Sequence, residues 1–333
     1  MLLNEKIIKD LSIMDIWEAK KRIDGFINRT PLIYSKGISE LSNTPCYLKL
    51  ENLQDINAFK IRGAANKILS LSEEERRLGV TTFSTGNHGL AVATISNKLG
   101  IESTICMSEN VPQVKVQAIQ SLGTKIKLVG SNQDDAQDYC FKLQREKGMT
   151  VINPFDDPYV IAGQGTIALE LLEDMPDLNN VIVPVSGGGI MSGIAFFLKT
   201  INPNIKVIGV SQDRAPVMVK SIEAGHPIRL EEKETLADSL LGGIGDDNQY
   251  TFKMVQKYVD EIQLISEDEI AEAMVLMLKT HRMLIEGASA TGIAEVVKNK
   301  DTNRYNGKTA IIITGSNVGY DSLVDILKKR KEL

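Results

Sequence analysis

Residues 181–198 read VIVPVSGGGIMSGIAFFL, a short apolar run followed by three glycines and a segment with helical spacing. The apolar run favours a buried strand, and the glycines favour a tight turn into a helix. Such a unit is typical of a parallel sheet covered by helices, where ligands bind beyond the carboxyl ends of the strands. The stretch therefore predicts an α/β fold and, at Gly187, Gly188 and Gly189, a candidate phosphate site whose N–H groups converge at a helix N-terminus. For the glycines alone, an ordinary tight turn is an equal alternative.

The same alternation of strands and helices continues along the chain. Further strands are expected at 79–84, 103–107, 125–129, 149–153, 206–211 and 309–314, and helices at 13–27, 88–99, 113–122, 134–147, 165–172 and 267–278. No repeat or flexible linker marks a boundary, so two domains in these 333 residues would be packed together and interleaved in sequence. Trp17 falls on the apolar face of the first helix, and we expect it in the core.

The composition excludes several classes of protein. The 38 Lys and Arg against 43 Asp and Glu give a net charge of −5, which offers no positive field to nucleic acid. No apolar stretch approaches the ~20 residues that span a bilayer, and the N-terminus lacks a secretory pattern, so neither a membrane nor export is expected. Cys46, Cys106 and Cys140 have no metal-ligand spacing and are most simply reduced thiols in a cytoplasmic protein.

Two nucleotide-binding motifs fail at the glycine-rich turn. A dinucleotide fingerprint that starts at Gly187 would need glycine where Ser192 stands, and a Walker A loop would need Lys-Ser or Lys-Thr after Gly193. We therefore disfavour a nicotinamide-dependent dehydrogenase and an NTPase.

Residues 84–89, STGNHG, lie between a strand and a helix and offer hydroxyls, an amide, an imidazole and free N–H groups. That mixture suits a carboxylate, although His88 taken alone is better explained as a helix-start residue with a local hydrogen bond.

Residues 57–64, NAFKIRGA, place Lys60 at the start of a helix beside Phe59. A helix N-terminus disfavours the ammonium form, and burial in a pocket would lower the amine pKa and expose a nucleophilic lone pair. A neutral amine beside a phosphate site points to pyridoxal phosphate, held as a Schiff base.

Together these segments resemble the serine/threonine dehydratase family of fold type II pyridoxal-phosphate enzymes, which includes threonine ammonia-lyases and serine racemases. Residues 57–64 resemble its S-F-K-x-R-G-A motif with Ala58 in place of Ser, residues 84–88 its substrate loop, and residues 186–189 its phosphate loop. Further matches are 29–32, 154–156, 161–166, 285–288 and 314–317, so the resemblance runs from about residue 11 to residue 327.

The resemblance implies a homodimer of chains with two doubly wound α/β domains. Residues 1–72 and 157–333 would form a large cofactor-binding domain, and residues 73–156 a small domain that closes over the substrate. Lys60 would hold the cofactor and move the α-carbon proton, with the Thr85 hydroxyl on the opposite face. The other implied cofactor contacts are Phe59, Asn87, Gly187, Gly188, Gly189, Ile190 and Thr314, and the implied substrate contacts are Ser84, Thr85, His88, Ser239 and Glu286. For Glu286, a solvated helix-end carboxylate is an equal alternative.

The implied reaction is β-elimination from a 3-hydroxy amino acid such as L-threonine or L-serine, giving a 2-oxo acid and ammonia. Because Lys60 and Thr85 would face each other across the α-carbon, a serine or other amino-acid racemase is the nearest alternative. A binding protein that senses an amino acid without turnover is another.

Three departures from the family pattern modify these expectations. Residues 237–245, ADSLLGGIG, look most like the hydroxyectoine-utilisation branch, which makes a hydroxyectoine-derived or 3-hydroxyaspartate substrate a further alternative. Ser211 and Val217 stand where metal-activated members have acidic ligands, so we expect no metal there. The chain stops soon after Thr314, so a regulatory domain and feedback by isoleucine are not expected.

Overall fold

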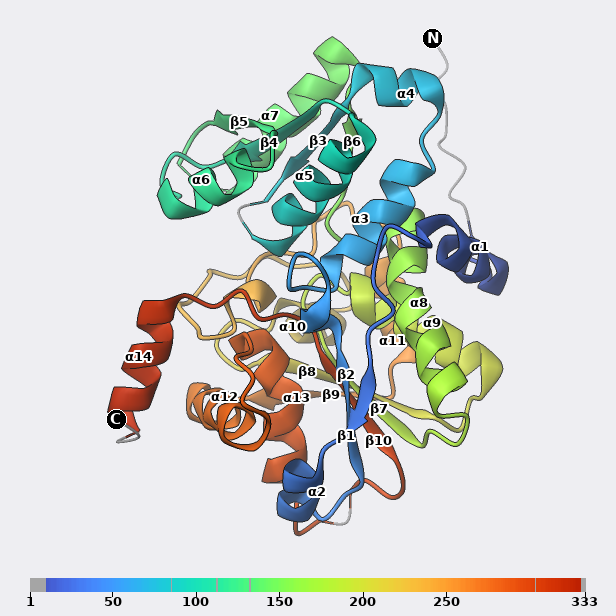
Figure 1. Cartoon of the computed structure of the whole chain (residues 1–333), viewed down its shortest axis with the longest axis vertical. Helices are drawn as coiled ribbons and strands as arrows, with labels where there is room; N and C mark the ends of the chain where they lie inside the picture. The colour runs from blue at the N-terminus through green and yellow to red at the C-terminus, as the bar shows by residue number, and fades with distance from the viewer. Residues whose placement is uncertain (1–9, 85, 112, 132, 303, 331–333) are drawn as a thin grey trace.

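The computed structural model describes residues 10–330 except 85, 112, 132 and 303, and these residues form two sheets flanked by helices (Figure 1). The larger sheet has the order β1-β2-β10-β7-β8-β9 and is parallel except for β1, which pairs antiparallel with β2. The smaller sheet, β5-β4-β3-β6, is wholly parallel. The α/β class expected from the sequence is confirmed.

Their strands are β1 Leu32–Tyr34, β2 Cys46–Leu50, β3 Val80–Phe83, β4 Ser103–Met107, β5 Lys125–Leu128, β6 Thr150–Val151, β7 Asn180–Pro184, β8 Lys206–Gln212, β9 Glu261–Ile265 and β10 Thr309–Ile313. Seven of these had been predicted. The three that the apolar pattern did not indicate are β1, β2 and β9, and β1 and β9 are the outer strands of the larger sheet. An edge strand pairs on one side only, so its side chains are only half buried and its apolar pattern is weak.

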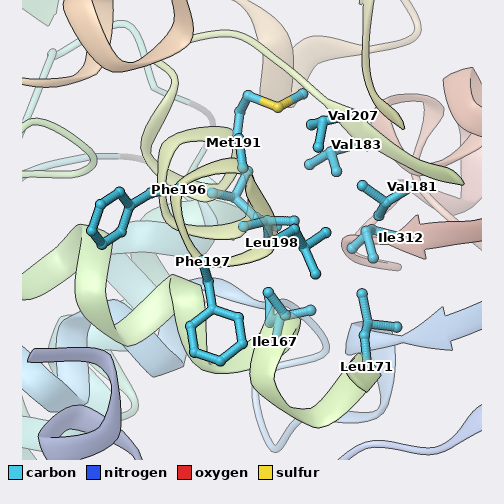
Figure 2. Packing of buried hydrophobic residues seen from close by; sticks show 14 of the residues in the cluster. Ile167, Leu171, Val181, Val183, Met191, Phe196, Phe197, Leu198, Val207 and Ile312 are labelled. Carbon is cyan, nitrogen blue, oxygen red and sulfur yellow. The ribbon is translucent and has the colours of Figure 1, made fainter. Parts of the chain in front are cut away.

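Helices cover both faces of the larger sheet. One face carries α1 Ile13–Ile23, α8 Pro158–Asp174, α9 Gly189–Ile201, α10 Val217–Ala224 and α11 Thr251–Tyr258, and the other carries α2 Lys36–Ser42, α12 Glu267–His281 and α13 Gly287–Lys298. Figure 2 shows the first of these layers, in which Ile167, Leu171 and Leu198 from α8 and α9 pack on Val181 and Ile312 of the sheet. Helices cover both faces, so the carboxyl ends of the parallel strands are the place for a ligand.

The remaining helices are α3 Lys60–Leu69, α4 Glu73–Leu78, α5 Asn87–Leu99, α6 Gln113–Gln120, α7 Gln133–Lys147 and α14 Tyr320–Lys329, with short 3₁₀ turns η1 Glu51–Leu53 and η2 Asp238–Leu240. In Figure 1, α3 lies between the two sheets, and α14 projects from the body of the molecule.

The expectation for Trp17 is wrong. Helix α1 buries Ile16, Ala19 and Ile23, whereas Trp17 is 46% exposed, with the Lys20 ammonium 5.8 Å from its ring centroid. One residue is a 100° rotation around a helix, so Trp17 lies beside the buried stripe that begins at Ile16 rather than in it.

Helices α3, α8 and α9 approach each other at glycines. A Cβ on Gly163 would lie 2.7 Å from the Cα of Gly63, and one on Gly193 would lie 2.6 Å from the backbone nitrogen of Gly165. Side chains at these crossings would push the helix backbones apart. The glycines therefore fix the distance between the helix that Lys60 begins and the helix that follows the glycine-rich turn.

A buried cluster of charged side chains links α3 to its neighbours. Arg62 is fully buried and donates to Glu51 through Nε at 2.7 Å and to Glu170 through Nη1 at 2.7 Å, and Lys49 also pairs with Glu170. Two cations and two carboxylates balance, so the charges are compensated away from solvent. Glu51 follows β2 and Glu170 belongs to α8, so Arg62 ties the lysine helix to both.

Candidate active site

The segment that precedes Lys60 is bound to the segment that follows β10. Ala58 and Gly315 form an antiparallel bridge, the Phe59 N–H donates to the Thr314 carbonyl at 2.9 Å, and the Ser316 N–H donates to the Asn57 carbonyl at 3.0 Å. Asn57 adopts a left-handed φ of 56°, which turns the chain into this pairing. Two segments some 250 residues apart thus bring Phe59, Lys60 and Thr314 together.

The Lys60 side chain contacts Pro154 and Phe59. Its Nζ donates to the Pro154 carbonyl at 2.8 Å and lies 5.3 Å from the centroid of the Phe59 ring. Burial lowers the pKa of the Lys60 amine to about 8, because desolvation penalises the ammonium form. A substantial share of this amine is therefore neutral near physiological pH and can act as a nucleophile.

Phe155, which follows Pro154 in the sequence, packs against the glycine-rich turn. A Cβ on Gly187 would lie 2.4 Å from the Phe155 ring, and one on Gly189 would lie 2.9 Å from the Phe155 Cα. Gly188 has a φ of 86° and precedes the first residue of α9, so side chains larger than hydrogen are disfavoured at all three positions. The lysine and the turn are thus held together through the adjacent residues Pro154 and Phe155.

The geometry of the turn suits a phosphate. Helix α9 begins at Gly189, and the first N–H groups of a helix have no partner within it and carry the positive end of its dipole. These N–H groups belong to the turn that includes the predicted Gly187, Gly188, Gly189 and Ile190, and an anion is their natural ligand.

Thr314 is held by a residue that sequence reasoning missed. The Thr314 Oγ1 lies 3.0 Å from the Oγ of Ser289 in α13. The Ser289 hydroxyl also donates to the Gly315 carbonyl at 2.8 Å. Thr314 is 4% exposed, so Ser289 fixes the direction of a buried hydroxyl. The serine directly follows the IEGA segment, residues 285–288, and no motif singles it out.

Asn87, Ser239 and Glu286 form one hydrogen-bonded cluster. Glu286 is 3% exposed; its Oε1 accepts from Asn87 Nδ2 at 2.9 Å, and its Oε2 accepts from Ser239 Oγ at 3.1 Å. Burial raises the pKa of the Glu286 carboxyl, as does nearby Asp238, while Asn87, the Asn317 N–H and Ser239 act in the opposite direction. Glu286 is therefore a buried polar anchor and not a solvated helix-end carboxylate.

Asn317, which the sequence had placed only within a matching motif, joins this cluster. Its N–H donates to Glu286 Oε1 at 2.9 Å, and its Nδ2 donates to Asn87 Oδ1 at 2.7 Å. The residue follows β10 by four positions, so its location beyond a strand end was the available signal.

In the described part of the segment around the start of α5, the side chains of Ser84 and His88 contact the backbone. His88 is 3% exposed, its Nε2 lies 2.9 Å from the Ile152 carbonyl, and burial, with the charge of Lys60, lowers its pKa to about 3. Ser84 Oγ accepts from the Gly86 N–H at 3.3 Å. Helix α5 begins at Asn87, so the first N–H groups of this helix are available to an anion. Thr85 lies outside the described residues.

Two further findings concern a metal ion and a membrane. Among the described residues, no group of three or more His, Cys, Asp or Glu side chains is arranged to hold a metal ion. No helix within the described ranges is long and apolar enough to cross a membrane.

Residues 23–315 match the family described as pyridoxal-phosphate dependent enzymes. The chain therefore belongs to this family, and its sheets have the fold of the type II members. A buried amine, a glycine cradle that a Cβ would fill and a fixed hydroxyl at Thr314 fit an aldehyde, a phosphate and a ring nitrogen, so the residues present suit the cofactor.

Individual relatives narrow the comparison. The chain is 41% identical over 319 residues to an L-threonine ammonia-lyase of Thermotoga maritima, covering 96% of this chain and 79% of that protein. It is 40% identical over 311 residues to a catabolic L-threonine dehydratase of Staphylococcus aureus, covering 92% of this chain and 89% of that protein. Among solved structures, maize serine racemase superposes with a TM-score of 0.89 at 33% identity, covering 97% of this chain and 99% of the racemase.

Proposed function

We propose that this chain is a pyridoxal-phosphate dependent lyase that eliminates the 3-hydroxyl group of a 3-hydroxy amino acid such as L-threonine or L-serine as water. The enamine that is released then takes up one water and yields a 2-oxo acid and ammonia. The observation that carries the proposal is the half-buried Lys60, whose amine donates to the carbonyl of Pro154 while the next residue, Phe155, packs against the glycine-rich turn. The similarity to two bacterial threonine-degrading enzymes supports this reaction class.

The cofactor site would use residues from both ends of the chain. Lys60 would hold the cofactor aldehyde, the N–H groups of Gly187, Gly188, Gly189 and Ile190 its phosphate, and Thr314 its ring nitrogen, with Phe59 packed beside the ring and Asn87 donating to the ring oxygen. When bound, pyridoxal phosphate supplies an electron sink that stabilises negative charge at the α-carbon of an amino acid. Thr314 would offer only a neutral hydroxyl to the ring nitrogen, and this would favour rapid loss of the β-substituent over long storage of that charge.

Substrate contacts would come from the loop before α5 and from the Glu286 cluster. The substrate carboxylate would be held by Ser84, Thr85 and His88, and His88 would act through its backbone N–H because its ring is buried against the Ile152 carbonyl. Ser239 and Glu286 would form a polar wall near the β-substituent. Lys60 Nζ would take the α-carbon proton, which needs the amine in its neutral form.

We also propose that residues 73–156 move as a small domain. This range contains the whole smaller sheet, while the larger sheet is built from residues outside it. Closure of this unit over the site would exclude water from the reacting atoms. We further propose a homodimer, and the three buried free thiols suit a reducing cytoplasm.

The test is a panel of 3-hydroxy amino acids, including threonine, serine and 3-hydroxyaspartate, assayed for ammonia and 2-oxo acid with purified, cofactor-loaded protein. We expect turnover of at least one member and a yellow protein whose colour and activity are both lost in Lys60→Ala. Absence of product from every member would refute the lyase assignment.

A racemase is the second candidate, and the likeness to maize serine racemase is the observation that favours it. Chiral analysis of serine after incubation separates the two reactions, because a racemase yields D-serine without consuming the amino acid. Formation of pyruvate and ammonia at a much higher rate than D-serine would favour the lyase.

A further inference from the structure

Three residues that lie far apart in sequence form a closed ring of hydrogen bonds. The Asn317 N–H and the Asn87 Nδ2 both donate to Glu286 Oε1, each at 2.9 Å, and the Asn317 Nδ2 donates to Asn87 Oδ1 at 2.7 Å. Asn87 begins α5, Glu286 precedes α13, and Asn317 follows β10. The ring therefore joins the proposed small domain to the segment that precedes α13 and to the segment that follows β10.

The Asn317 amide has its orientation set by the main chain. Its Nδ2 also donates to the Ile56 carbonyl at 2.8 Å, and a carbonyl oxygen can only accept. The nitrogen of this amide must therefore face Ile56, which lies four residues before Lys60. Its second hydrogen is then directed to Asn87, so the lysine segment specifies what Asn87 meets.

The orientation of the Asn317 amide in turn determines the orientation of the Asn87 amide. With its oxygen toward Asn317 Nδ2 and its nitrogen toward Glu286 Oε1, both contacts pair a donor with an acceptor. A flipped amide would place nitrogen against nitrogen and oxygen against oxygen. Glu286 accepts one of the two hydrogens on Asn87 Nδ2, and the residues that the structure describes provide no acceptor for the second, which a ligand could use.

We propose that Asn317 is a positioning residue that fixes the Asn87 amide as a hydrogen-bond donor toward the ring oxygen of pyridoxal phosphate. The inference rests on the proposed function, because it assigns Asn87 to that oxygen. Asn317 itself is exposed, which allows substitution with little effect on packing. Loss of its donor removes one of the two contacts that hold Asn87 in this orientation.

The experiment compares Asn317→Ala, Asn317→Asp, Asn87→Ala and the double variant Asn87→Ala/Asn317→Ala by the visible absorption and affinity of bound pyridoxal phosphate. We expect Asn317→Ala to weaken cofactor affinity about tenfold and to shift the absorption band. Asn317→Asp should have the larger effect, because its carboxylate cannot donate to Ile56 or Asn87. In the Asn87→Ala background, loss of Asn317 should change neither quantity further.

Asn299→Asp is the matched control. Asn299 Nδ2 also donates to a backbone carbonyl and to a glutamate, both of Glu295, at 3.0 and 2.9 Å. This control introduces the same charge beside a carboxylate at the far end of α13, and it should leave the absorption band unchanged.

Each result has a defined meaning. An unchanged band and affinity in both Asn317 variants would overturn the inference, and so would equal effects in the presence and absence of the Asn87 side chain, which indicate a structural role only. A wild-type protein that binds no pyridoxal phosphate would instead refute the proposed function.

Discussion

Gly63 and Gly163 meet where helix α3 crosses helix α8, so closely that a Cβ on Gly163 would lie 2.7 Å from the Cα of Gly63 and 2.6 Å from the Arg62 carbonyl. Both neighbours are backbone atoms, which cannot rotate out of the way. The contact sets the position of Lys60 at the start of α3 relative to the segment around Pro154.

Gly163→Ala is expected to destabilise the protein although alanine is the better helix former. The gain in helix propensity is about 1 kcal/mol, whereas overpacking against backbone costs about 1–3 kcal/mol and moves α3. Urea denaturation should show the net loss, and titration with pyridoxal phosphate should show weaker binding. Gly243→Ala, where the new Cβ meets only the Gly245 nitrogen at 3.9 Å, is the control and should change cofactor affinity little.

Arg62→Met should cost about 3–5 kcal/mol in the free energy of unfolding, because Glu51 and Glu170 would remain buried with Lys49 as their one neighbouring cation. Lys20→Met removes the exposed pair with Glu173 and should cost less than about 1 kcal/mol. Denaturant unfolding of both variants checks the contrast. Similar costs for the two would mean that the Arg62 cluster does not stabilise α3 as inferred.

Uptake of pyridoxal phosphate by the apoenzyme should follow the titration of Lys60. With a pKa of about 8, the neutral fraction of the amine rises about fivefold from pH 7 to 8 and less than about twofold from pH 8 to 9. The same shift makes burial of the protonated amine destabilising below pH 8, and that cost disappears as the pH rises from 8 toward the ordinary value of 10.5. Stopped-flow absorbance measures the rate of uptake, and a lysine derivative with a blocked α-amino group and a free side-chain amine is the reference. A tenfold rise in the rate per pH unit up to pH 10 would contradict the lowered pKa of Lys60.

His88 should remain neutral throughout the pH range in which the folded enzyme works. Its pKa of about 3 lies below the ordinary 6.5, so the unfolded chain binds the extra proton first and stability is lost as the pH falls from 6.5 toward 3. The Cε1–H resonance of His88, assigned with a His88→Gln variant, should not move between pH 8 and 5. Movement with a midpoint near 6.5 would show that the ring is solvated and free to bind a substrate carboxylate.

The sequence by itself determined the α/β class, seven of the strands and the lysine and glycine segments, because alternating apolar runs and glycine turns are local properties of the chain. It also indicated the cofactor, since a helix-start lysine and a glycine turn in the same chain together suit an aldehyde and a phosphate. Only the tertiary structure decided how these parts meet: the bridge from Ala58 to Gly315, the Pro154 carbonyl under Lys60, and the roles of Ser289 and Asn317. These contacts join residues up to about 260 positions apart, and no local pattern encodes them. Trp17 was misplaced for the same reason: the helical period defines an apolar stripe, but only packing decides which edge of that stripe faces the core.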